Sequence, residues 1–294
     1  MAFVPISISI RDQIVPVSGS GSLFEIIGRI GVNRIEVTVD GDGLLPHLRA
    51  REGKPLSIRD DESVLELREV LQIEGTQISA FLLATDFSGP DADLHLAWAA
   101  QVVHTASRLQ IPVVRIDPLT SEHLLTMQAI RDRFGRRVNQ LLYDTKETSV
   151  DLGMENHGRL FNDPTILDQV LTEIPDPRFG LTLDTGNLYW WGHPISRVYE
   201  LIERYAPRVK HTHIKNIRYP SALRDKQRAI GFEYEKYCGT LYNGDLDLRR
   251  IVKILRQAGY RRDLCVEDES LFKVPEGERV EILRRNVACL RDAQ

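Results

Sequence analysis

The sequence predicts an α/β protein whose parallel strands close into a (β/α)8 barrel, and three observations favour that fold. Short runs rich in Val, Ile and Leu alternate with longer runs of helical periodicity along the whole chain. Strand then helix, repeated eight times, is typical of this barrel. No stretch rich in Pro, Gly or Ser divides the 294 residues, so we expect one domain spanning residues 1–294.

Eight short apolar or alternating runs are the expected strands. Their residues are 5–10, 34–39, 78–83, 113–117, 151–155, 180–184, 210–214 and 264–267. Seven longer runs carry apolar residues at helical spacing and are the expected helices. Their residues are 61–73, 91–109, 120–142, 164–171, 195–205, 248–258 and 276–290. Helices therefore follow most of the strands, as the barrel requires.

One connection is much longer than the others, because residues 216–245 separate the seventh strand from its helix. Connections of about 2 to 6 residues are the rule in such units. The segment is rich in basic and aromatic residues, and structureless loops of this length are usually functional. We expect this insertion to contribute to the functional site, and a merely decorative insertion is the alternative.

Composition limits the classes of partner. With 38 Lys and Arg against 42 Asp and Glu, the formal charge is −4, which argues against nucleic-acid or membrane-surface binding driven by bulk charge. No apolar run reaches the roughly 18 residues of a membrane span. The three cysteines are widely spaced, and an odd number without a CxxC pair indicates neither a disulfide framework nor a zinc knuckle. We expect a cytoplasmic protein.

Four successive strands end on residues that can bind metals. Active sites of such barrels lie at the carboxyl ends of the strands, where Glu155, Asp184, His213 and Glu267 stand. The separations are 184 − 155 = 29, 213 − 184 = 29 and 267 − 213 = 54, the last being about one period plus the insertion. Equal periods place the side chains at one level of neighbouring strands. Each residue alone is more often solvated or hydrogen-bonded, but four in register indicate a site.

Three carboxylates that converge would repel one another unless a cation lay between them. A divalent metal ion bound between the carboxylates would remove this repulsion. Oxygen donors with one imidazole favour Mn²⁺, Co²⁺, Fe²⁺ or Mg²⁺, and Zn²⁺ is less suited. His211 alternates with His213 on the same strand. We take His213, at the outer end, as the ligand, with His211 one layer deeper as the alternative.

Arg115 is expected to point into the barrel near the end of the fourth strand. An inward arginine is costly unless it is paired. It therefore contacts either a substrate oxygen or the carboxylates of Asp117 or Glu155.

Other polar and aromatic residues near the strand ends are candidates for substrate binding. His157 follows Glu155 by two residues and either contacts the substrate or is solvated. Lys215 and Arg218 are candidates for an anionic substrate group, with ordinary surface charge as the alternative. Trp190 is a candidate for stacking on the apolar face of a sugar, and the alternative, which is commoner for such residues, is packing against a helix.

Several segments of the carboxyl-terminal half resemble a known family. They are LGMENH at 152–157, LDTGN at 183–187, HTHIKN at 211–216, DLDL at 245–248 and LCVE at 264–267. Together they resemble the xylose-isomerase-like TIM-barrel superfamily of sugar epimerases and isomerases, which also includes keto-inositol dehydratases and apurinic endonucleases. Over the first half of the chain, the resemblance rests mainly on the regular alternation of predicted strands and helices.

The resemblance implies roles for the four strand-end residues. Ketose 3-epimerases of this superfamily bind one Mn²⁺, Co²⁺ or Mg²⁺ through a Glu, an Asp, a His and a Glu, and the two glutamates move the proton. Carried over by motif, Glu155, Asp184, His213 and Glu267 are ligands, and Glu155 and Glu267 are the acid/base pair. Homodimers or homotetramers are common among such relatives.

One position departs from the family pattern. Many relatives have a histidine three residues after the strand-six aspartate, where it contacts substrate, but this chain has Asn187. The run DTGN followed by Trp190 is closer to the 2-ketogluconate-utilisation epimerase-like branch. That branch implies a sugar acid as the substrate.

The sequence therefore predicts a metal-dependent epimerase or isomerase of a ketose or keto-sugar acid, most simply with Mn²⁺, acting through an enediolate that the metal stabilises. A keto-sugar or keto-inositol dehydratase is the nearest alternative, because its first proton abstraction is the same. An apurinic endonuclease is a distant one, since binding DNA needs a basic face.

Overall fold

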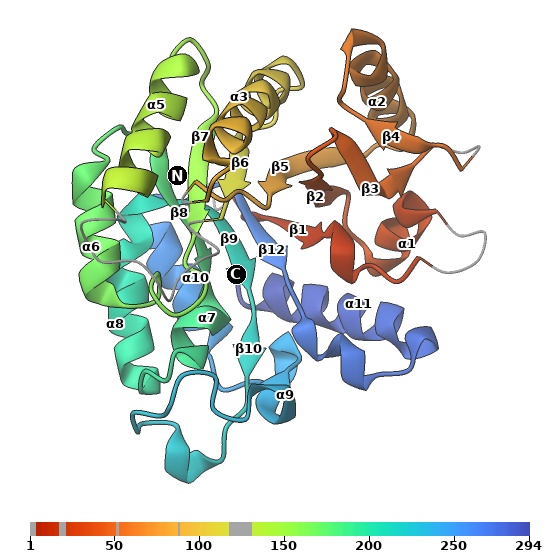
Figure 1. The fold of residues 1–294 in the computed structure, drawn as a ribbon. Coiled ribbons are helices and arrows are strands. Elements are labelled where there is room, and N and C mark those ends of the chain that lie inside the picture. Colours follow the sequence, from red (N-terminus) through yellow and green to blue (C-terminus); the bar gives the residue numbers. More distant parts are fainter. Residues whose placement is uncertain (1–3, 18–21, 51–52, 88, 118–130) are drawn as a thin grey trace. The chain divides into compact units, whose positions relative to one another are not determined.

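The computed structural model describes residues 4–17, 22–50, 53–87, 89–117 and 131–294. Eight parallel strands form a closed barrel in the order β1, β12, β9, β8, β7, β6, β5, β2 (Figure 1). They are β1 (Ser7–Arg11), β2 (Arg34–Val39), β5 (Gln77–Leu83), β6 (Val113–Ile116), β7 (Asp151–Glu155), β8 (Phe179–Asp184), β9 (Val209–Ile214) and β12 (Asp263–Val266). The predicted barrel is confirmed, and every predicted strand overlaps an observed one. Among the described residues, no helix is both long and apolar enough to cross a membrane.

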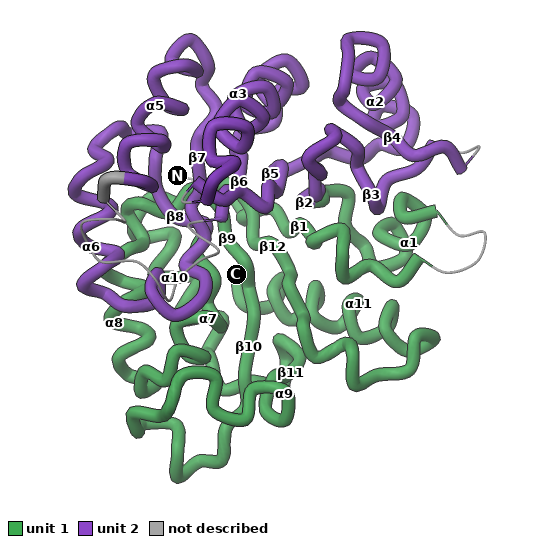
Figure 2. Tube along the Cα trace, viewed as in Figure 1, with its two compact units in different colours: residues 1–35, 183–294 green, residues 36–182 purple. Residues whose placement is uncertain are grey.

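The chain divides into two compact units, which Figure 2 distinguishes by colour. Unit 1 comprises residues 1–35 and 183–294, and unit 2 comprises residues 36–182. The single domain expected over residues 1–294 stays a prediction.

Unit 2 contains helices that follow the strand pattern. They are α2 (Asp61–Ile73), α3 (Ala92–Arg108), α5 (Arg136–Asp144), which follows a π-helical turn (Arg131–Gly135), and α6 (Pro164–Glu173). Asp60 caps α2 by accepting a hydrogen bond from the Ser63 amide at 2.8 Å. The predicted helix 120–142 lies partly outside the described residues. An antiparallel pair of strands, β3 (Leu44–Arg49) and β4 (Pro55–Ser57), was not predicted.

Unit 1 contains the remaining long helices. They are α1 (Leu23–Ile30), α8 (Ile195–Tyr205), α10 (Leu248–Gln257) and α11 (Glu276–Asp292). The short helix α7 (Thr185–Trp190) begins directly after β8, and Asp184 caps it by accepting a hydrogen bond from the Asn187 amide at 2.8 Å. Neither α1 nor α7 was among the predicted helices, because each is too short to show several turns of apolar periodicity.

The inner face of unit 1 is polar and in register across three strands. Ser9 lies beside Cys265, and Cys265 lies beside His213. All three side chains are fully buried. Because alternate residues of a strand share a face, Arg11 and Glu267 follow at the next level toward the carboxyl ends.

The insertion at residues 216–245 is folded rather than structureless. It contains β10 (Asn216–Ile217), which pairs antiparallel with β11 (Cys238–Gly239), and three short helical turns. The turns are η5 (Ser221–Leu223), α9 (Tyr234–Tyr237) and η6 (Leu241–Asn243). A buried arginine, Arg228, donates hydrogen bonds to the carbonyl oxygens of Tyr189 at 3.0 Å and His193 at 2.8 Å. Its guanidinium also lies 4.5 Å from the ring centre of Tyr189 in α7 and 4.3 Å from that of Tyr219 in the insertion, so Arg228 ties the insertion to α7.

Gly153 in β7 provides a test of strand packing in unit 2. A Cβ atom added there would lie 2.4 Å from Thr182 Oγ1 on the neighbouring strand. We expect Gly153→Ala to lower the free energy of unfolding in urea by about 1–3 kcal/mol.

The control is Gly28→Ala, in the exposed part of α1, where nothing lies within 4 Å of the added atom. This change should raise the free energy of unfolding by about 0.5–1 kcal/mol, because alanine is the better helix former. Equal effects of the two substitutions would contradict the packing described for β7.

Candidate functional site

Three side chains with metal-ligand atoms meet at the carboxyl ends of the unit 1 strands. Asp184 ends β8, His213 lies one residue before the end of β9, and Glu267 follows β12. All three are at most 1% exposed. One ligand atom from each lies within 4.8 Å of the others, and His213 Nδ1 is 3.3 Å from Glu267 Oε2. Two carboxylates and an imidazole form a donor set that suits Mn²⁺, Mg²⁺, Co²⁺ or Zn²⁺.

The other histidine of β9 lies one layer deeper. His211 Nδ1 is 3.1 Å from Asp263 Oδ1, and the second oxygen of Asp263 accepts a hydrogen bond from Ser9. The rings of His211 and His213 meet edge to face, 5.6 Å apart. His211 therefore supports His213 from below, with its own orientation set by Asp263.

Lys215 lies among the carboxylates at the ends of these strands. Its side chain is 5% exposed, and Nζ is 2.9 Å from Asp184 Oδ2, 3.3 Å from Glu267 Oε2 and 2.9 Å from Glu269 Oε1. Burial alone would lower the pKa of this ammonium group, but the three carboxylates outweigh burial and raise the pKa well above its ordinary value. Lys215 is therefore charged and neutralises part of the buried negative charge.

The chain makes room for this lysine in α7. A Cβ atom on Gly186 would lie 2.7 Å from Lys215 Cγ and 2.8 Å from its Cβ, so a larger residue there would displace the lysine stem. Asn187 Oδ1 is 3.5 Å from Lys215 Nζ. Residues of α7 and the end of β9 thus fit together as one layer.

The sequence did not identify Arg11 as a residue of this cluster. Arg11, at the end of β1, forms an ion pair with Glu267. The predicted first strand stops at residue 10, one residue short of the observed end. The alternation of Ser7, Ser9 and Arg11 on one face is the signal that could have revealed it.

Of the other predicted substrate-binding residues of unit 1, Trp190 contacts the insertion and Arg218 lies within it. The carbonyl oxygen of Trp190 accepts a hydrogen bond from the Gly231 amide at 2.9 Å, and a Cβ atom on Gly231 would lie 3.3 Å from the indole nitrogen. Arg218 is exposed and donates a hydrogen bond to Asn243 Oδ1.

In unit 2, Glu155 ends β7 with 2% exposure. Arg115 Nε donates a hydrogen bond to Glu155 Oε2 at 2.8 Å, and Arg115 Nη2 lies 2.9 Å from Asp117 Oδ1. Burial lowers the pKa of Arg115, but these two carboxylates reverse the shift and raise it. The ion pairs foreseen for Arg115 are therefore present. His157 has a side chain 59% exposed, with Nδ1 3.8 Å from Asp117 Oδ1.

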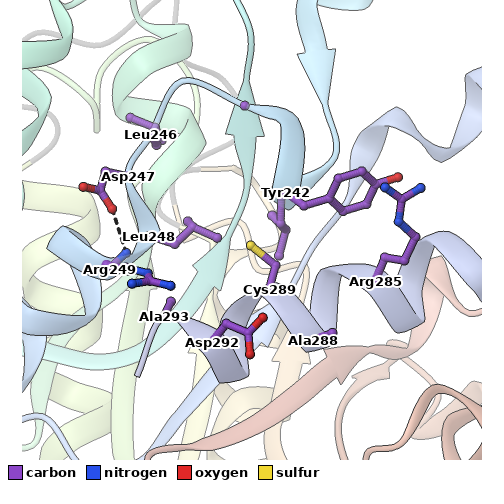
Figure 3. A pocket seen from close by; sticks show the side chains of 12 residues that line it. Tyr242, Leu246, Asp247, Leu248, Arg249, Arg285, Ala288, Cys289, Asp292 and Ala293 are labelled. Atoms are coloured by element: carbon purple, nitrogen blue, oxygen red, sulfur yellow. Dashed lines mark hydrogen bonds between the residues drawn. The ribbon is translucent and has the colours of Figure 1, made fainter.

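A separate pocket of about 630 Å³ lies in unit 1 where the end of the insertion meets α10 and α11 (Figure 3). Its lining includes Tyr242, Asp247, Arg285 and Cys289. The Arg285 guanidinium lies 4.0 Å from the ring centre of Tyr242, and Asp247 caps α10. Since no predicted site residue lines this pocket, it is distinct from the ligand cluster.

One family model matches most of the chain, and relatives of lower identity match parts of it. A family model described as a xylose isomerase-like TIM barrel matches residues 24–293. The chain is 27% identical over 106 residues to an inosose dehydratase of Yersinia enterocolitica, covering 35% of each protein. It is 27% identical over 226 residues to an inosose dehydratase of Clostridium perfringens, covering 73% of this chain and 75% of that protein. The Yersinia match and two further matches, to inosose dehydratases of Serratia proteamaculans and Erwinia tasmaniensis, span 35% to 45% of those proteins' own length.

Solved structures share the fold. The IOLI protein with a binding zinc atom has a TM-score of 0.72 at 15% identity, and 98% of this chain and 99% of that one are covered. D-psicose 3-epimerase in the presence of D-fructose has a TM-score of 0.70 at 13% identity, with the same coverage. At these identities, the similarity shows the fold alone.

Asp184→Asn tests the ligand cluster. Asparagine keeps the cap of α7 but replaces a carboxylate with a neutral amide. We expect the affinity for Mn²⁺, measured by calorimetry, to fall by at least the roughly 10- to 100-fold that loss of an outer-shell partner costs.

The matched control is Asp225→Asn, at an exposed aspartate of the insertion that accepts a hydrogen bond from the Ser196 amide at 3.3 Å. Its affinity for Mn²⁺ should equal that of the wild type. Unchanged Mn²⁺ affinity in a folded Asp184→Asn protein would exclude Asp184 as a ligand.

Proposed function

Because the chain belongs to the xylose isomerase-like TIM-barrel family, we propose that it is a divalent-metal-dependent epimerase or isomerase of a ketose or keto-sugar acid. The observation that carries the proposal is the buried cluster of Asp184, His213 and Glu267 at the carboxyl ends of the strands, the end at which barrels of this type place catalysis. The similarity of the fold to that of D-psicose 3-epimerase also supports an epimerase.

We propose that Glu155 completes the ligand set. Within unit 2, Glu155 on β7 is paired in register with Thr182 on β8. The strand β8 continues without interruption to Asp184, two residues farther on the same face. This register supports one site at which Glu155 and Asp184 act together.

A bound divalent cation would stabilise the negative charge that develops on the substrate's carbonyl oxygen when the neighbouring C–H loses its proton. The chain's own residues supply the proton transfer. We assign Glu155 and Glu267 as the pair that removes and returns the proton. Arg115 holds the Glu155 carboxylate in place, and Arg11 and Lys215 do the same for Glu267. Return of the proton to the opposite face gives epimerisation, and return to the neighbouring carbon gives isomerisation.

Mn²⁺ is the proposed metal, and the zinc atom of the IOLI structure makes Zn²⁺ the first alternative to test. Asn187, Trp190, His157 and Arg218 are proposed to line the substrate site. A small sugar or sugar acid is the proposed substrate, and the protein is proposed to be a cytoplasmic homodimer or homotetramer.

A dehydratase is the second candidate function, and the similarity to inosose dehydratases favours it. The same proton abstraction would then be followed by loss of a hydroxyl group from the next carbon as water. Mass spectrometry of the product separates the two candidates. An epimerase or isomerase conserves the mass of the substrate, whereas a dehydratase lowers it by one water.

Glu155→Gln and Glu267→Gln test the proton-transfer roles. Each replaces a base with an amide of the same shape, so the rate of deuterium wash-in from D₂O, followed by NMR, should fall by about 10²- to 10⁴-fold.

Glu276→Gln, in the exposed first turn of α11, is the matched control and should keep the wild-type rate. Full turnover of the folded, metal-loaded Glu155→Gln and Glu267→Gln proteins would refute the assignment.

A further inference from the structure

A chain of polar contacts links the insertion to the candidate ligands of unit 1. The Tyr234 hydroxyl, in α9, donates a hydrogen bond to Glu269 Oε2. Lys215 Nζ donates to the other oxygen of Glu269 at 2.9 Å and also lies 2.9 Å from Asp184 Oδ2. Through Glu269, the insertion therefore reaches the side chains that stand at the ends of β8 and β12.

The insertion presents Tyr234 by a strained turn. Glu233, the preceding residue, has a left-handed backbone with φ of 43°, which is uncommon for a residue other than glycine. Such strain persists where the surroundings impose it, and it clusters at functional sites. The surroundings are firm here, because the Gly231 amide donates to the carbonyl oxygen of Trp190. Burial raises the pKa of the Tyr234 phenol, so this group stays protonated and donates.

Charge at this end of the site disfavours an anionic substrate group. The Lys215 ammonium group donates a hydrogen bond to Glu269 and also lies within 3.3 Å of carboxylate oxygens of Asp184 and Glu267, so these three carboxylates already balance its charge. Glu269 is the exposed member of the set, with 41% of its side chain accessible. A carboxylate or phosphate brought to this position would meet the negative charge of Glu269 at close range.

An uncharged hydroxyl group suits the same position. The two oxygens of Glu269 offer about four acceptor sites, of which Lys215 and Tyr234 each use one. A substrate hydroxyl can donate to a remaining site, and the phenol oxygen of Tyr234 can accept from a second hydroxyl. Glu269 and Tyr234 can therefore hydrogen-bond two neighbouring uncharged hydroxyl groups of a substrate.

We propose that Glu269 and Tyr234 are specificity-determining residues that bind hydroxyl groups of an uncharged polyhydroxy ketone and exclude sugar acids. This inference rests on the proposed function and narrows its substrate class. It also gives Lys215 a role different from the one that the sequence suggests, since Lys215 holds Glu269 in place instead of binding an anion.

The test compares neutral ketohexoses with hexulosonic acids of the same carbon number, in deuterium wash-in with the metal-loaded full chain. We expect the wild type to exchange deuterium at least about 10-fold faster, in kcat/KM, with the best neutral ketose. Glu269→Gln should lower kcat/KM for that ketose by about 10- to 100-fold, the range for a hydrogen bond to a charged group, and should raise it for the acids. Tyr234→Phe should lower it by about 2- to 10-fold and leave the exclusion of acids intact.

Glu235→Gln, one residue after Tyr234 and exposed, is the matched control and should behave as the wild type. Calorimetric binding of the neutral ketose should weaken in Glu269→Gln and remain at wild-type strength in Glu235→Gln. Melting temperatures of the variants check that each is folded.

Two results would overturn this inference and leave the proposed function intact. One is faster exchange with the acids than with the neutral ketoses in the wild type. The other is an unchanged preference in a folded Glu269→Gln protein. Absence of deuterium exchange with both classes, in wild-type protein shown by calorimetry to hold its metal, would instead overturn the proposed function together with this inference.

Discussion

A carboxylate that is taken out of water needs a positive partner close by, and this requirement organises both units of the chain. In unit 1, the ammonium group of Lys215 lies between Asp184, Glu267 and Glu269. In unit 2, the guanidinium of Arg115 lies between Glu155 and Asp117. Removing either cation would leave buried negative charge uncompensated. The elements that position these cations, above all β6, β9 and α7, are therefore held to a narrow geometry.

Asp184 has both a structural contact and a contact within the candidate site. Its Oδ1 atom caps α7 through the Asn187 amide, while Oδ2 faces Lys215. The first turn of α7 contains Gly186, whose missing side chain admits the lysine stem. The cap, the glycine and the lysine are consequently interdependent, because a change in one alters the position of the others.

The sequence was sufficient for much of the fold, since strong periodic signals were decisive. The helices α2 and α8 begin and end where apolar spacing predicts, at residues 61–73 and 195–205. The helix α7 was missed because six residues are too few for periodicity to show. Equal spacing along the chain also anticipated that Asp184 and His213 would stand at neighbouring strand ends. Spacing could not assign partners such as Arg11 to Glu267, because pairing across strands depends on register and on where each strand stops.

The insertion has an inner part and an outer part that differ in how they are held. Arg228 joins five backbone carbonyl groups, three of them in the insertion and two at or just after α7. Residues beyond it, through Tyr237, form the outer turn that contains Tyr234. The outer turn has its own attachments, through the Gly231 amide on the carbonyl oxygen of Trp190 and the Tyr234 hydroxyl on Glu269. A substitution at Tyr234 can therefore remove the contact with Glu269 while the arginine anchor stays in place.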